Sequence, residues 1–343
     1  MSEGRAIGST VSEDRSEGRA RTGAIDGTAT DLVTLGEAMQ LLVAEPGVAL
    51  RHALHYRAGV AGAETNVAIG VARQGCSVRW LSRLGADPAG EFVLARLRAE
   101  NVDVSAVELD AGRPTGMLVR DSHPHRPVAV QYFRTGSAAS ALSADYVRQH
   151  WTGNASLVHV SGITPMLSPS AHQATLTLLE LAQDSGASIS FDPNVRRKLG
   201  TDEQWRSTVG PLLERAELVF AGSDELAMIT GMNEPARLLD GGAKAVLIKH
   251  PDRSVELSTP EGSWRRQSLV STVVDAVGAG DALVAGYLAA WLRQCSPEDS
   301  LLAALATAAL VVESVTDSDG LPDRSELELA LRRVGGTATE MDR

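Results

Sequence analysis

Residues 270–292 read VSTVVDAVGAGDALVAGYLAAWL, and this stretch decides the fold. Its β-branched residues predict a strand, its glycines at 278 and 280 predict a tight turn, and the small and apolar residues after them predict a helix. A strand that feeds a turn and then a helix presents several free backbone N–H groups at one point. Together with the positive end of the helix dipole, these amides form a site of the kind that phosphates occupy.

Asp281 lies in the first turn of the predicted helix, beside this anion site. A carboxylate is a poor phosphate ligand because the two negative charges repel, so we interpret Asp281 as a base aimed at a hydroxyl that attacks the phosphate. The alternative is an ordinary helix start, in which Asp281 complements the dipole and has no chemical role. Small residues on one face of the helix favour the functional interpretation, since they allow close packing on a sheet: Ala282, Ala285, Gly286 and Ala289.

The composition limits the classes of protein. At 343 residues the chain suits one large α/β domain with insertions, and its net charge of −11 argues against nucleic acid or an anionic membrane surface as a partner. A nucleotide remains compatible with this charge, because it needs only local positive groups. The chain has two cysteines, Cys76 and Cys295, which lie far apart in the sequence and suit a reducing compartment. No apolar run approaches the roughly 20 residues that span a bilayer. We therefore expect a cytoplasmic protein.

The first 30 residues differ from the rest. They contain the pentapeptide SEGRA twice, at 2–6 and 16–20, and few large apolar side chains. Such a segment cannot bury enough apolar surface to order itself, so we predict a disordered tail over 1–30 and a folded domain over 31–335. The tail has no apolar core for a secretory signal, and its acidic residues argue against a transit peptide.

Strand and helix patterns alternate through the folded part. The predicted strands are 31–36, 77–82, 157–160, 188–191, 218–220, 245–249 and 255–258, and 264–270 leads into the central stretch. A glycine-rich loop runs into a helix within 59–75, and the other predicted helices are 87–101, 168–184, 202–215, 223–230, 297–314 and 325–333. This alternation predicts an α/β fold with a doubly wound, mostly parallel sheet and helices on both of its faces.

Residues 113–134 interrupt the alternation. Two short strands, 115–120 and 127–133, are joined by the sequence DSHPHR, which is typical of an antiparallel hairpin. The turn contains His123 and His125, but no third ligand is near them in sequence, so we expect histidines in solvent rather than a metal site. The hairpin is therefore predicted as a small β insertion in a single domain.

Two separated motifs resemble those of the ribokinase-like, PfkB-type sugar kinases. The first is the loop and helix around Gly62 and Asn66, followed by RLG at 83–85 and by Asp87. The second is DAVGAGD at 275–281, and the two motifs occur in the family's order. The resemblance covers most of the folded chain. It implies a ribokinase-like fold with a small β lid, and transfer of the γ-phosphoryl group of ATP, with Mg²⁺, to a sugar hydroxyl.

The resemblance also implies roles for particular residues. Asp281 would be the base, and the amides of Gly278, Ala279 and Gly280 would take up charge on the transferred phosphoryl group. The other implied positions are Gly62 and Asn66 on the sugar side, Lys249, Gly278 and Gly280 at the nucleotide, Glu225 at Mg²⁺ through water, and Asp275 as a candidate ligand of a monovalent cation such as K⁺. The lid would be built from about 38–58 and 112–135, and a homo-oligomer would form through it.

Three further stretches look like those of 2-keto-3-deoxygluconate kinases: YFRTGSAAS at 132–140, SGITPMLS at 161–168 and FDPNVRRKL at 191–199. This likeness implies that Tyr132, Arg134 and Arg196 face a sugar acid. The implication agrees with chemistry, because guanidinium groups bind carboxylates well. The alternatives are an ordinary ion pair for each arginine and a cross-strand contact for the tyrosine.

The chain departs from the family pattern at three places. Gly222 replaces an asparagine, Ala276 replaces a threonine, and HPDRS at 250–254 replaces a Gly-x-x-Gly turn that lies along the nucleotide in relatives. Proline lacks a backbone donor and side chains limit close backbone approach, so we expect weakened nucleotide binding. The leading prediction is a sugar-acid kinase. The alternatives are a fructokinase or ribokinase acting on a neutral sugar, and a catalytically weak sensor of a sugar acid.

Overall fold

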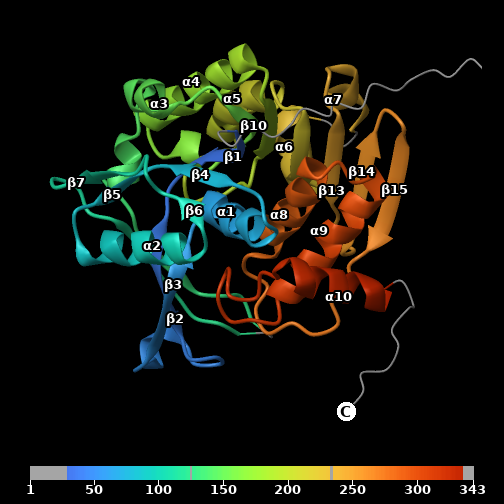
Figure 1. The fold of residues 1–343 in the computed structure, drawn as a ribbon. Coiled ribbons are helices and arrows are strands. Elements are labelled where there is room, and N and C mark those ends of the chain that lie inside the picture. Colours follow the sequence, from blue (N-terminus) through green and yellow to red (C-terminus); the bar gives the residue numbers. More distant parts are fainter. Residues whose placement is uncertain (1–28, 124–125, 232–234, 335–343) are drawn as a thin grey trace, which may run out of the picture.

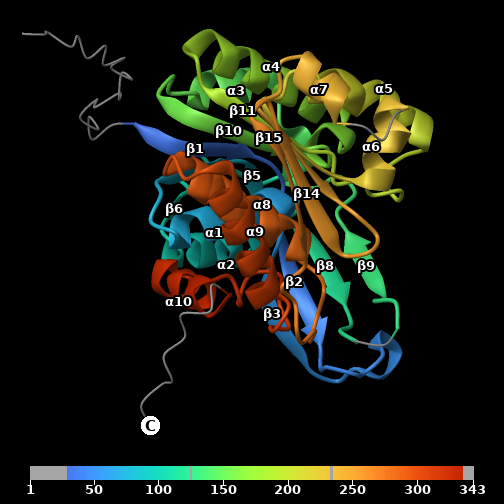
Figure 2. The same cartoon turned by 90° about the vertical axis from the view of Figure 1, so that its right-hand side faces the viewer.

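The structure is a computed structural model and describes residues 29–123, 126–231 and 235–334. The predicted tail lies outside the described residues except for its last two positions, and His125 lies outside them as well. A large sheet crosses the molecule with helices on both sides, and a smaller sheet extends from one end of it (Figures 1 and 2). The predicted doubly wound α/β fold with a small β lid is confirmed.

Within the described residues, the large sheet has nine strands. Their order is β15 (Gly262–Gln267), β14 (Ser254–Thr259), β13 (Ala245–Lys249), β12 (Leu218–Gly222), β11 (Ser188–Asp192), β10 (Ala155–Ser161), β1 (Thr30–Leu35), β4 (Val78–Leu81) and β6 (Val102–Asp103). Neighbouring strands from β13 to β6 run parallel, whereas β14 is antiparallel to β13 and β15 is antiparallel to β14. Parallel strands are buried on both faces, which explains their nearly continuous apolar sequences.

Helices cover both faces of this sheet (Figure 2). One face holds α1 (Ala63–Arg73), α2 (Pro88–Ala99), α8 (Ala279–Leu292) and α9 (Pro297–Val311), with α10 (Arg324–Val334) against α9. The other holds α3 (Ala144–His150), α4 (Pro169–Ser185), α5 (Asp202–Leu213), α6 (Ser223–Thr230) and α7 (Ala236–Asp240). Successive side chains of β1 point to opposite faces of the sheet. Leu32 packs against the helices of the first face and Val33 against those of the second, so the sheet separates two apolar cores. None of the helices in the described ranges is long and apolar enough to cross a membrane.

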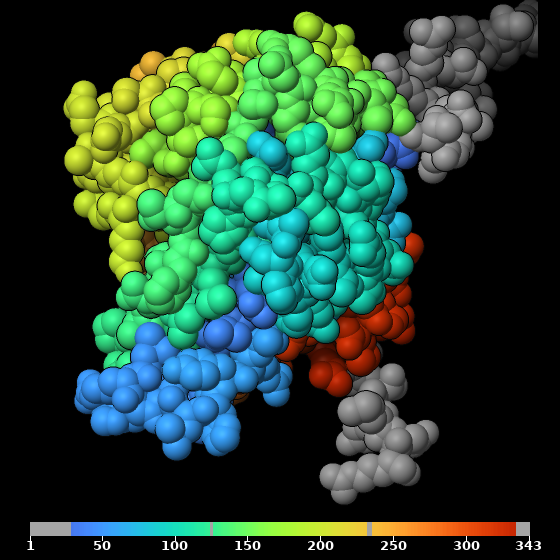
Figure 3. All heavy atoms as spheres, turned by 90° about the vertical axis from the view of Figure 1, so that its left-hand side faces the viewer, coloured from blue at the N-terminus to red at the C-terminus, as the bar shows by residue number. Residues whose placement is uncertain are grey.

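A four-stranded sheet, which we call the lid, projects from the body of the molecule (Figures 2 and 3). Its order is β3 (Tyr56–Ala61), β2 (Met39–Ala44), β8 (Gly116–Arg120) and β9 (Val130–Phe133). β8 and β9 form the predicted antiparallel hairpin, and β2 runs parallel to β8. Leu54, Tyr56 and Phe133 are exposed on or beside this sheet, a feature compatible with the predicted association through the lid, which stays a prediction.

The predicted strand at the start of the central stretch is wrong. Residues 270–274 run without a paired strand from β15 toward α8, and the amides of Val274 and Asp275 both donate to the carbonyl of Val312, at 2.8 and 3.1 Å. Their β-branched side chains favour an extended backbone, but a sheet also needs a neighbouring strand to pair with. The glycine-rich segment before α1 is not a loop either, because Gly59, Val60 and Ala61 end strand β3.

Several short elements were not predicted. They are β2, β3, α3, α7, the short strand β6, the pair β5 (Arg83–Gly85) and β7 (Glu108–Asp110), and the 3-10 helices Leu50–His52, Ala138–Ala141 and Thr164–Met166. Most have five or fewer residues or lie in the lid, where one face of the sheet is only partly covered. A short or half-buried segment carries too few apolar positions for a clear periodicity.

Candidate active site

The predicted site residues meet at the carboxyl edge of the large sheet. Asp192 ends β11, Gly222 ends β12 and Lys249 ends β13, and these three strands are adjacent and parallel. Helix α8 begins beside them, since a Cβ built on Gly280 would lie 3.7 Å from Nζ of Lys249. The carboxyl ends of parallel strands share one edge, so residues from distant parts of the chain come together there.

Asp281 lies in the first turn of α8, as predicted, and two asparagines hold its carboxylate. Its Oδ2 accepts a hydrogen bond from Nδ2 of Asn66 at 2.8 Å, and its Oδ1 accepts one from Nδ2 of Asn194 at 3.2 Å. Burial raises the pKa of Asp281 to about 7, although the bond from Asn66 and the charge of Arg196 act in the opposite direction. A carboxyl group that changes charge near neutral pH is suited to general-base chemistry.

Gly278 shapes the turn before α8. Its φ of 88° lies in the left-handed region, and a Cβ there would lie 2.5 Å from the carbonyl oxygen of Asp317. Glycine meets both constraints because it has no side chain. The turn places the amides of Ala279 and Gly280 at the start of a 14-residue helix, where the dipole favours an anion. This arrangement suits the predicted phosphate site.

Lys249 brings a positive charge to the same place. Its Nζ lies 3.1 Å from Oδ2 of the buried Asp192. Burial lowers the pKa of Lys249, but the carboxylates of Asp192, Glu225 and Asp281 outweigh this effect and raise it above its ordinary value. The lysine is therefore cationic at neutral pH and lies where a phosphate at the start of α8 would meet it.

A cavity of about 160 Å³ adjoins Lys249 and the start of α8. Its other lining residues include Arg253 and Val270, so the altered turn at 250–254 forms part of its wall. Within that turn, the amide of His250 donates to the carbonyl of Ser254 at 2.9 Å, and Arg253 has a φ of 63°. A residue with a side chain rarely adopts this conformation, so the backbone of the turn is strained at Arg253.

A second cavity, of about 260 Å³, lies between the lid and the loop after β11. Tyr132 and Arg134 of the lid line it together with Arg196 and Lys198 of the loop, so the three residues predicted to face a sugar acid are brought together. The centre of the Tyr132 ring lies 5.8 Å from the guanidinium carbon of Arg134 and 5.4 Å from Nζ of Lys198. Arg196 and Lys198 bring positive charge that favours an anion in this cavity, and the Tyr132 ring offers it an apolar face.

The two arginines differ in their partners. Nη2 of Arg134 forms an ion pair with Oε2 of the buried Glu37. Arg196 instead donates through Nη1 to the carbonyls of Asn194 at 3.4 Å and Val195 at 3.1 Å, and it has no ion-pair partner in the described part of the chain. The ion-pair alternative therefore applies to Arg134, whereas the charge of Arg196 is available to a ligand.

Glu225 fixes the loop that carries Arg196. Its Oε2 accepts the N–H of Gly222 at 2.8 Å and so caps α6, and its Oε1 accepts the N–H of Val195, also at 2.8 Å. Each carboxylate oxygen has a further lone pair. The predicted contact of Glu225 with Mg²⁺ through water stays a prediction.

Two other predicted positions have clear structural roles. A Cβ on Gly62 would lie 2.5 Å from the carbonyl oxygen of Glu37, so glycine lets the start of α1 approach this strand end and present Asn66 to Asp281. Asp275 forms an ion pair with the guanidinium of Arg120. Across the described ranges, no group of three or more His, Cys, Asp or Glu side chains is placed to hold a metal ion. The sugar contact of Gly62 remains a prediction.

Sequence reasoning missed several residues of the site. Asp192 and Asn194 hold Lys249 and Asp281, and the polar sequence directly after a buried strand was the signal that could have indicated them. Glu37 and Arg120 were also missed as the partners of Arg134 and Asp275. Their pairings join distant segments, so no local pattern reveals them.

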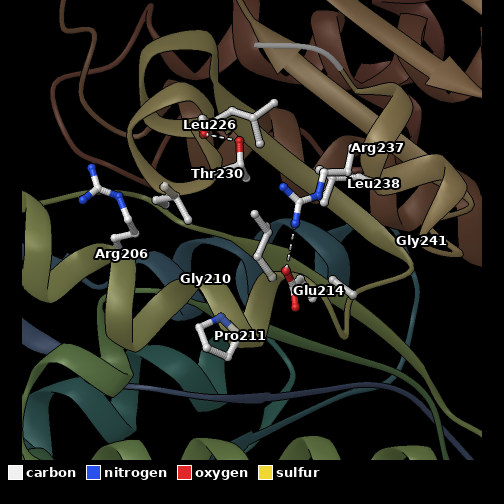
Figure 4. Close-up of a pocket in the computed structure, with 12 residues that line it drawn as sticks. Arg206, Gly210, Pro211, Glu214, Leu226, Thr230, Arg237, Leu238 and Gly241 are labelled. Atoms are coloured by element: carbon white, nitrogen blue, oxygen red, sulfur yellow. Dashed lines mark hydrogen bonds and ion pairs between the residues drawn. The ribbon is translucent and has the colours of Figure 1, made fainter. Parts of the chain in front are cut away.

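A larger cavity, of about 500 Å³, lies between α5, α6 and α7 (Figure 4). Arg206 and Arg237 stand at its sides, and Nη2 of Arg237 lies 3.8 Å from Oε1 of Glu214. Thr230 at the carboxyl end of α6 lines this cavity, whereas Glu225 near the amino end of the same helix borders the site described above. The cavity is therefore separate from the predicted catalytic residues.

The carboxyl group of Asp281, with its raised pKa, lies beside a helix start that favours an anion, at the carboxyl edge of a doubly wound sheet, and this arrangement suits a phosphotransferase acting on a small molecule. Residues 29–324 match the pfkB family of carbohydrate kinases. The chain therefore belongs to the pfkB family and is an ATP-dependent carbohydrate kinase.

The chain is similar to several carbohydrate kinases whose names describe different sugars. The chain is 36% identical over 306 residues to the 2-dehydro-3-deoxygluconokinase of Bacillus subtilis (strain 168), covering 87% of this chain and 94% of that protein. It is 32% identical to a fructokinase of Klebsiella pneumoniae, covering 71% and 80%. A crystal structure of an E. coli protein assigned as Ribokinase II, in complex with ATP and Mg²⁺, superposes with a TM-score of 0.82 over 89% of this chain and 99% of that one. At 22% identity, the last likeness shows the fold alone.

Proposed function

We propose that this kinase phosphorylates 2-keto-3-deoxygluconate at a terminal hydroxyl. The observation that carries the proposal is the guanidinium of Arg196, which lines the cavity beside Tyr132 and has no carboxylate partner within the described residues. A sugar acid would supply that carboxylate. The B. subtilis relative, whose name describes a kinase of the same sugar acid, supports the choice. The test is ADP release with a panel of sugar acids and neutral sugars.

In this mechanism, Asp281 removes the proton of the attacking hydroxyl. Asn66 and Asn194 orient its carboxylate, and the amides at the start of α8 together with Lys249 offset the charge of the transferred phosphoryl group. Bound Mg²⁺ would neutralise charge on the triphosphate. The carboxylates of Asp192 and Glu225 at this edge are oxygen donors of the kind that Mg²⁺ prefers, and Glu225 would hold the ion through water.

A neutral sugar is the alternative substrate. The pairing of Arg134 with Glu37 favours it, because one of the two arginines predicted for the carboxylate is already neutralised. The fructokinase relative agrees with this alternative. The other alternative is a catalytically weak sensor, which would bind the sugar acid without releasing ADP. The strained turn at 250–254 supports this alternative.

We propose a cytoplasmic location for this kinase. Cys76 is partly buried and Cys295 is exposed, and both are free thiols. Free thiols persist in a reducing compartment, which supports the proposal.

The rate should depend on pH through Asp281. Its pKa is raised to about 7, so the carboxyl is protonated and inactive as a base at lower pH. We expect kcat/KM to rise as pH increases toward about 7 and then to level off. The Asp281→Asn variant should retain no such step in its residual activity. The measurement is kcat/KM across neutral pH at constant ionic strength; a profile that is flat below pH 7 in the unaltered enzyme would contradict the assignment.

The turn at 250–254 should limit ATP affinity. Arg253 adopts a left-handed conformation that glycine accepts without strain, whereas Ser254 is buried in β14 and accepts a hydrogen bond from Nε of Arg265. We therefore expect the double change Pro251→Gly and Arg253→Gly to lower KM for ATP by roughly threefold to tenfold, because it restores a backbone donor and permits close backbone approach, and one regained hydrogen bond is worth about 0.5–1.5 kcal/mol. Pro251→Ala is the control, because it restores the backbone N–H at position 251 but adds less backbone freedom than glycine and leaves Arg253 in place. An unchanged KM in the double variant would show that the turn does not contact the nucleotide.

A further inference from the structure

Arg120, the last residue of lid strand β8, is buried beside the turn that leads into α8. Its Nη1 forms an ion pair with Oδ2 of Asp275, and its Nη2 lies 2.8 Å from Oδ1 of Asp317. Nη2 also donates to the carbonyl of Val315 at 2.9 Å, and Nη1 donates to the carbonyl of Asp121 at 3.3 Å. The side chain is 1% exposed, so a cation from the lid is enclosed by two acidic side chains of the body.

The two carboxylates belong to the segments that shape the phosphate site. Oδ1 of Asp275 accepts the N–H of Val277 at 3.0 Å, one residue before Gly278. The carbonyl of Asp317 is the atom that a Cβ on Gly278 would strike at 2.5 Å. The position of the turn before Ala279 and Gly280 therefore depends on Asp275 and on the segment that contains Asp317.

A monovalent metal ion does not fit beside Asp275 in this arrangement. Such an ion needs several oxygen ligands, and the guanidinium of Arg120 already occupies the place between Oδ2 of Asp275, Oδ1 of Asp317 and the carbonyl of Val315, where these oxygens could surround it. A second positive charge in contact with Arg120 would also be repelled. Burial acts to lower the pKa of Arg120, but the charges of Asp317 and Asp275 raise it above its ordinary value, so the group stays charged.

We infer that Arg120 is a built-in cation that takes the place of a monovalent metal ion, and that it positions the phosphate site from the lid. Arg120 touches neither Asp281 nor the start of α8 directly, so its role is one of positioning. It neutralises Asp275 and Asp317 where an anionic nucleotide must bind nearby. Nucleotide binding in this kinase consequently needs no K⁺.

The test is the affinity for MgATP, measured by calorimetry without sugar, so that its outcome does not depend on the proposed substrate. Ionic strength is held at about 0.1 M with either KCl or tetramethylammonium chloride, which keeps screening constant. The unaltered kinase should bind MgATP equally well in both salts. Tighter binding in KCl would overturn the inference.

The variant Arg120→Met removes the cation and leaves two buried carboxylates without a partner. We expect MgATP to bind it about tenfold to a hundredfold more weakly in tetramethylammonium chloride, because charge-assisted hydrogen bonds are lost, and KCl or a low concentration of guanidinium chloride should restore much of the affinity. Arg120→Lys keeps the charge and should show no response to K⁺. If Arg120→Met does not fold, the unaltered kinase and Arg120→Lys still decide the question.

Arg126→Met is the matched control. Arg126 follows the same lid strand, and its Nη1 also pairs with a buried carboxylate, Oδ2 of Asp121, at 2.7 Å, but it contacts neither Asp275 nor Asp317. This variant should bind MgATP independently of K⁺, like the unaltered kinase. A loss of affinity in Arg120→Met that no added cation relieves, or an equal loss in Arg126→Met, would show that Arg120 only stabilises the fold and would overturn the inference.

Discussion

The Asp281→Asn variant should lose kcat by about 10²–10⁴-fold, the usual effect of removing a general base. The asparagine has nearly the same shape and cannot take up the proton of the attacking hydroxyl. The sugar should still bind, because the cavity between the lid and Arg196 is unchanged. The measurements are kcat from ADP release and sugar affinity from calorimetry.

Asp299→Asn is the control for this variant. Asp299 occupies the same position in the first turn of α9 as Asp281 does in α8, but it is exposed and bonds to Ser296. If Asp281 only complemented the helix dipole, both variants would lose a little stability and neither would lose activity. Near-normal turnover of Asp281→Asn would therefore favour the ordinary helix start that the sequence left open.

The free energy of unfolding should fall over the pH range in which the activity rises. The pKa of Asp281 is raised to about 7 in the folded protein, above the ordinary value of 3.8. The folded state therefore binds more protons than the unfolded state between these values, and the stability contributed by this group falls as pH rises toward 7. Asp281→Asn removes the cost of the buried charge, so its Tm should exceed that of the unaltered protein at pH 8.

Arg196→Ala should raise KM for 2-keto-3-deoxygluconate by about tenfold to a hundredfold, the value of one charge-assisted hydrogen-bonded pair. The same change should barely affect KM for D-fructose, which has no carboxylate. Arg196→Lys should recover little, because a point charge does not replace a two-pronged guanidinium. Arg197→Ala is the control: Arg197 is the next residue, and its Nη1 lies 3.4 Å from Oδ1 of the partly exposed Asp202. Equal rises of KM for both sugars would refute the carboxylate contact.

Arg134→Ala should behave differently, although the sequence assigns both arginines the same role. Its removal leaves the buried Glu37 without its cation, and an unpaired buried charge is costly. We therefore expect a lower Tm and weaker binding of both sugars. The two arginines are distinguished by their partners, which only the structure reveals.

Sequence patterns predicted the large sheet well because its parallel strands are buried on both faces. The predicted strand 245–249 and helix 223–230 coincide with β13 and α6. The same reasoning failed at 270–274, where the β-branched residues favour an extended backbone but no strand lies alongside. It also failed for β2, whose side chains alternate between buried and partly exposed over only six residues.

The candidate site, like the fold, could be predicted from the sequence only in part. The glycine turn and Asp281 belong to one short motif, so their spacing alone predicted a base beside an anion site. Their partners come from far away: Asn66 is separated from Asp281 by 215 positions, and Arg120 from Asp275 by 155. Such contacts depend on how the strands are ordered in the sheet and on where the lid lies, which a single sequence does not encode locally.

The most direct test of the proposed function is ADP release by the unaltered enzyme with MgATP and either 2-keto-3-deoxygluconate, D-fructose or no sugar. The proposal predicts rapid ADP release with the sugar acid and a kcat/KM at least about tenfold higher than with fructose, because only the acid engages Arg196. An equal or higher kcat/KM with fructose would identify a neutral-sugar kinase. Binding of the sugar acid without ADP release above the rate in the absence of sugar would identify a sensor, and either result would contradict the proposed substrate and reaction.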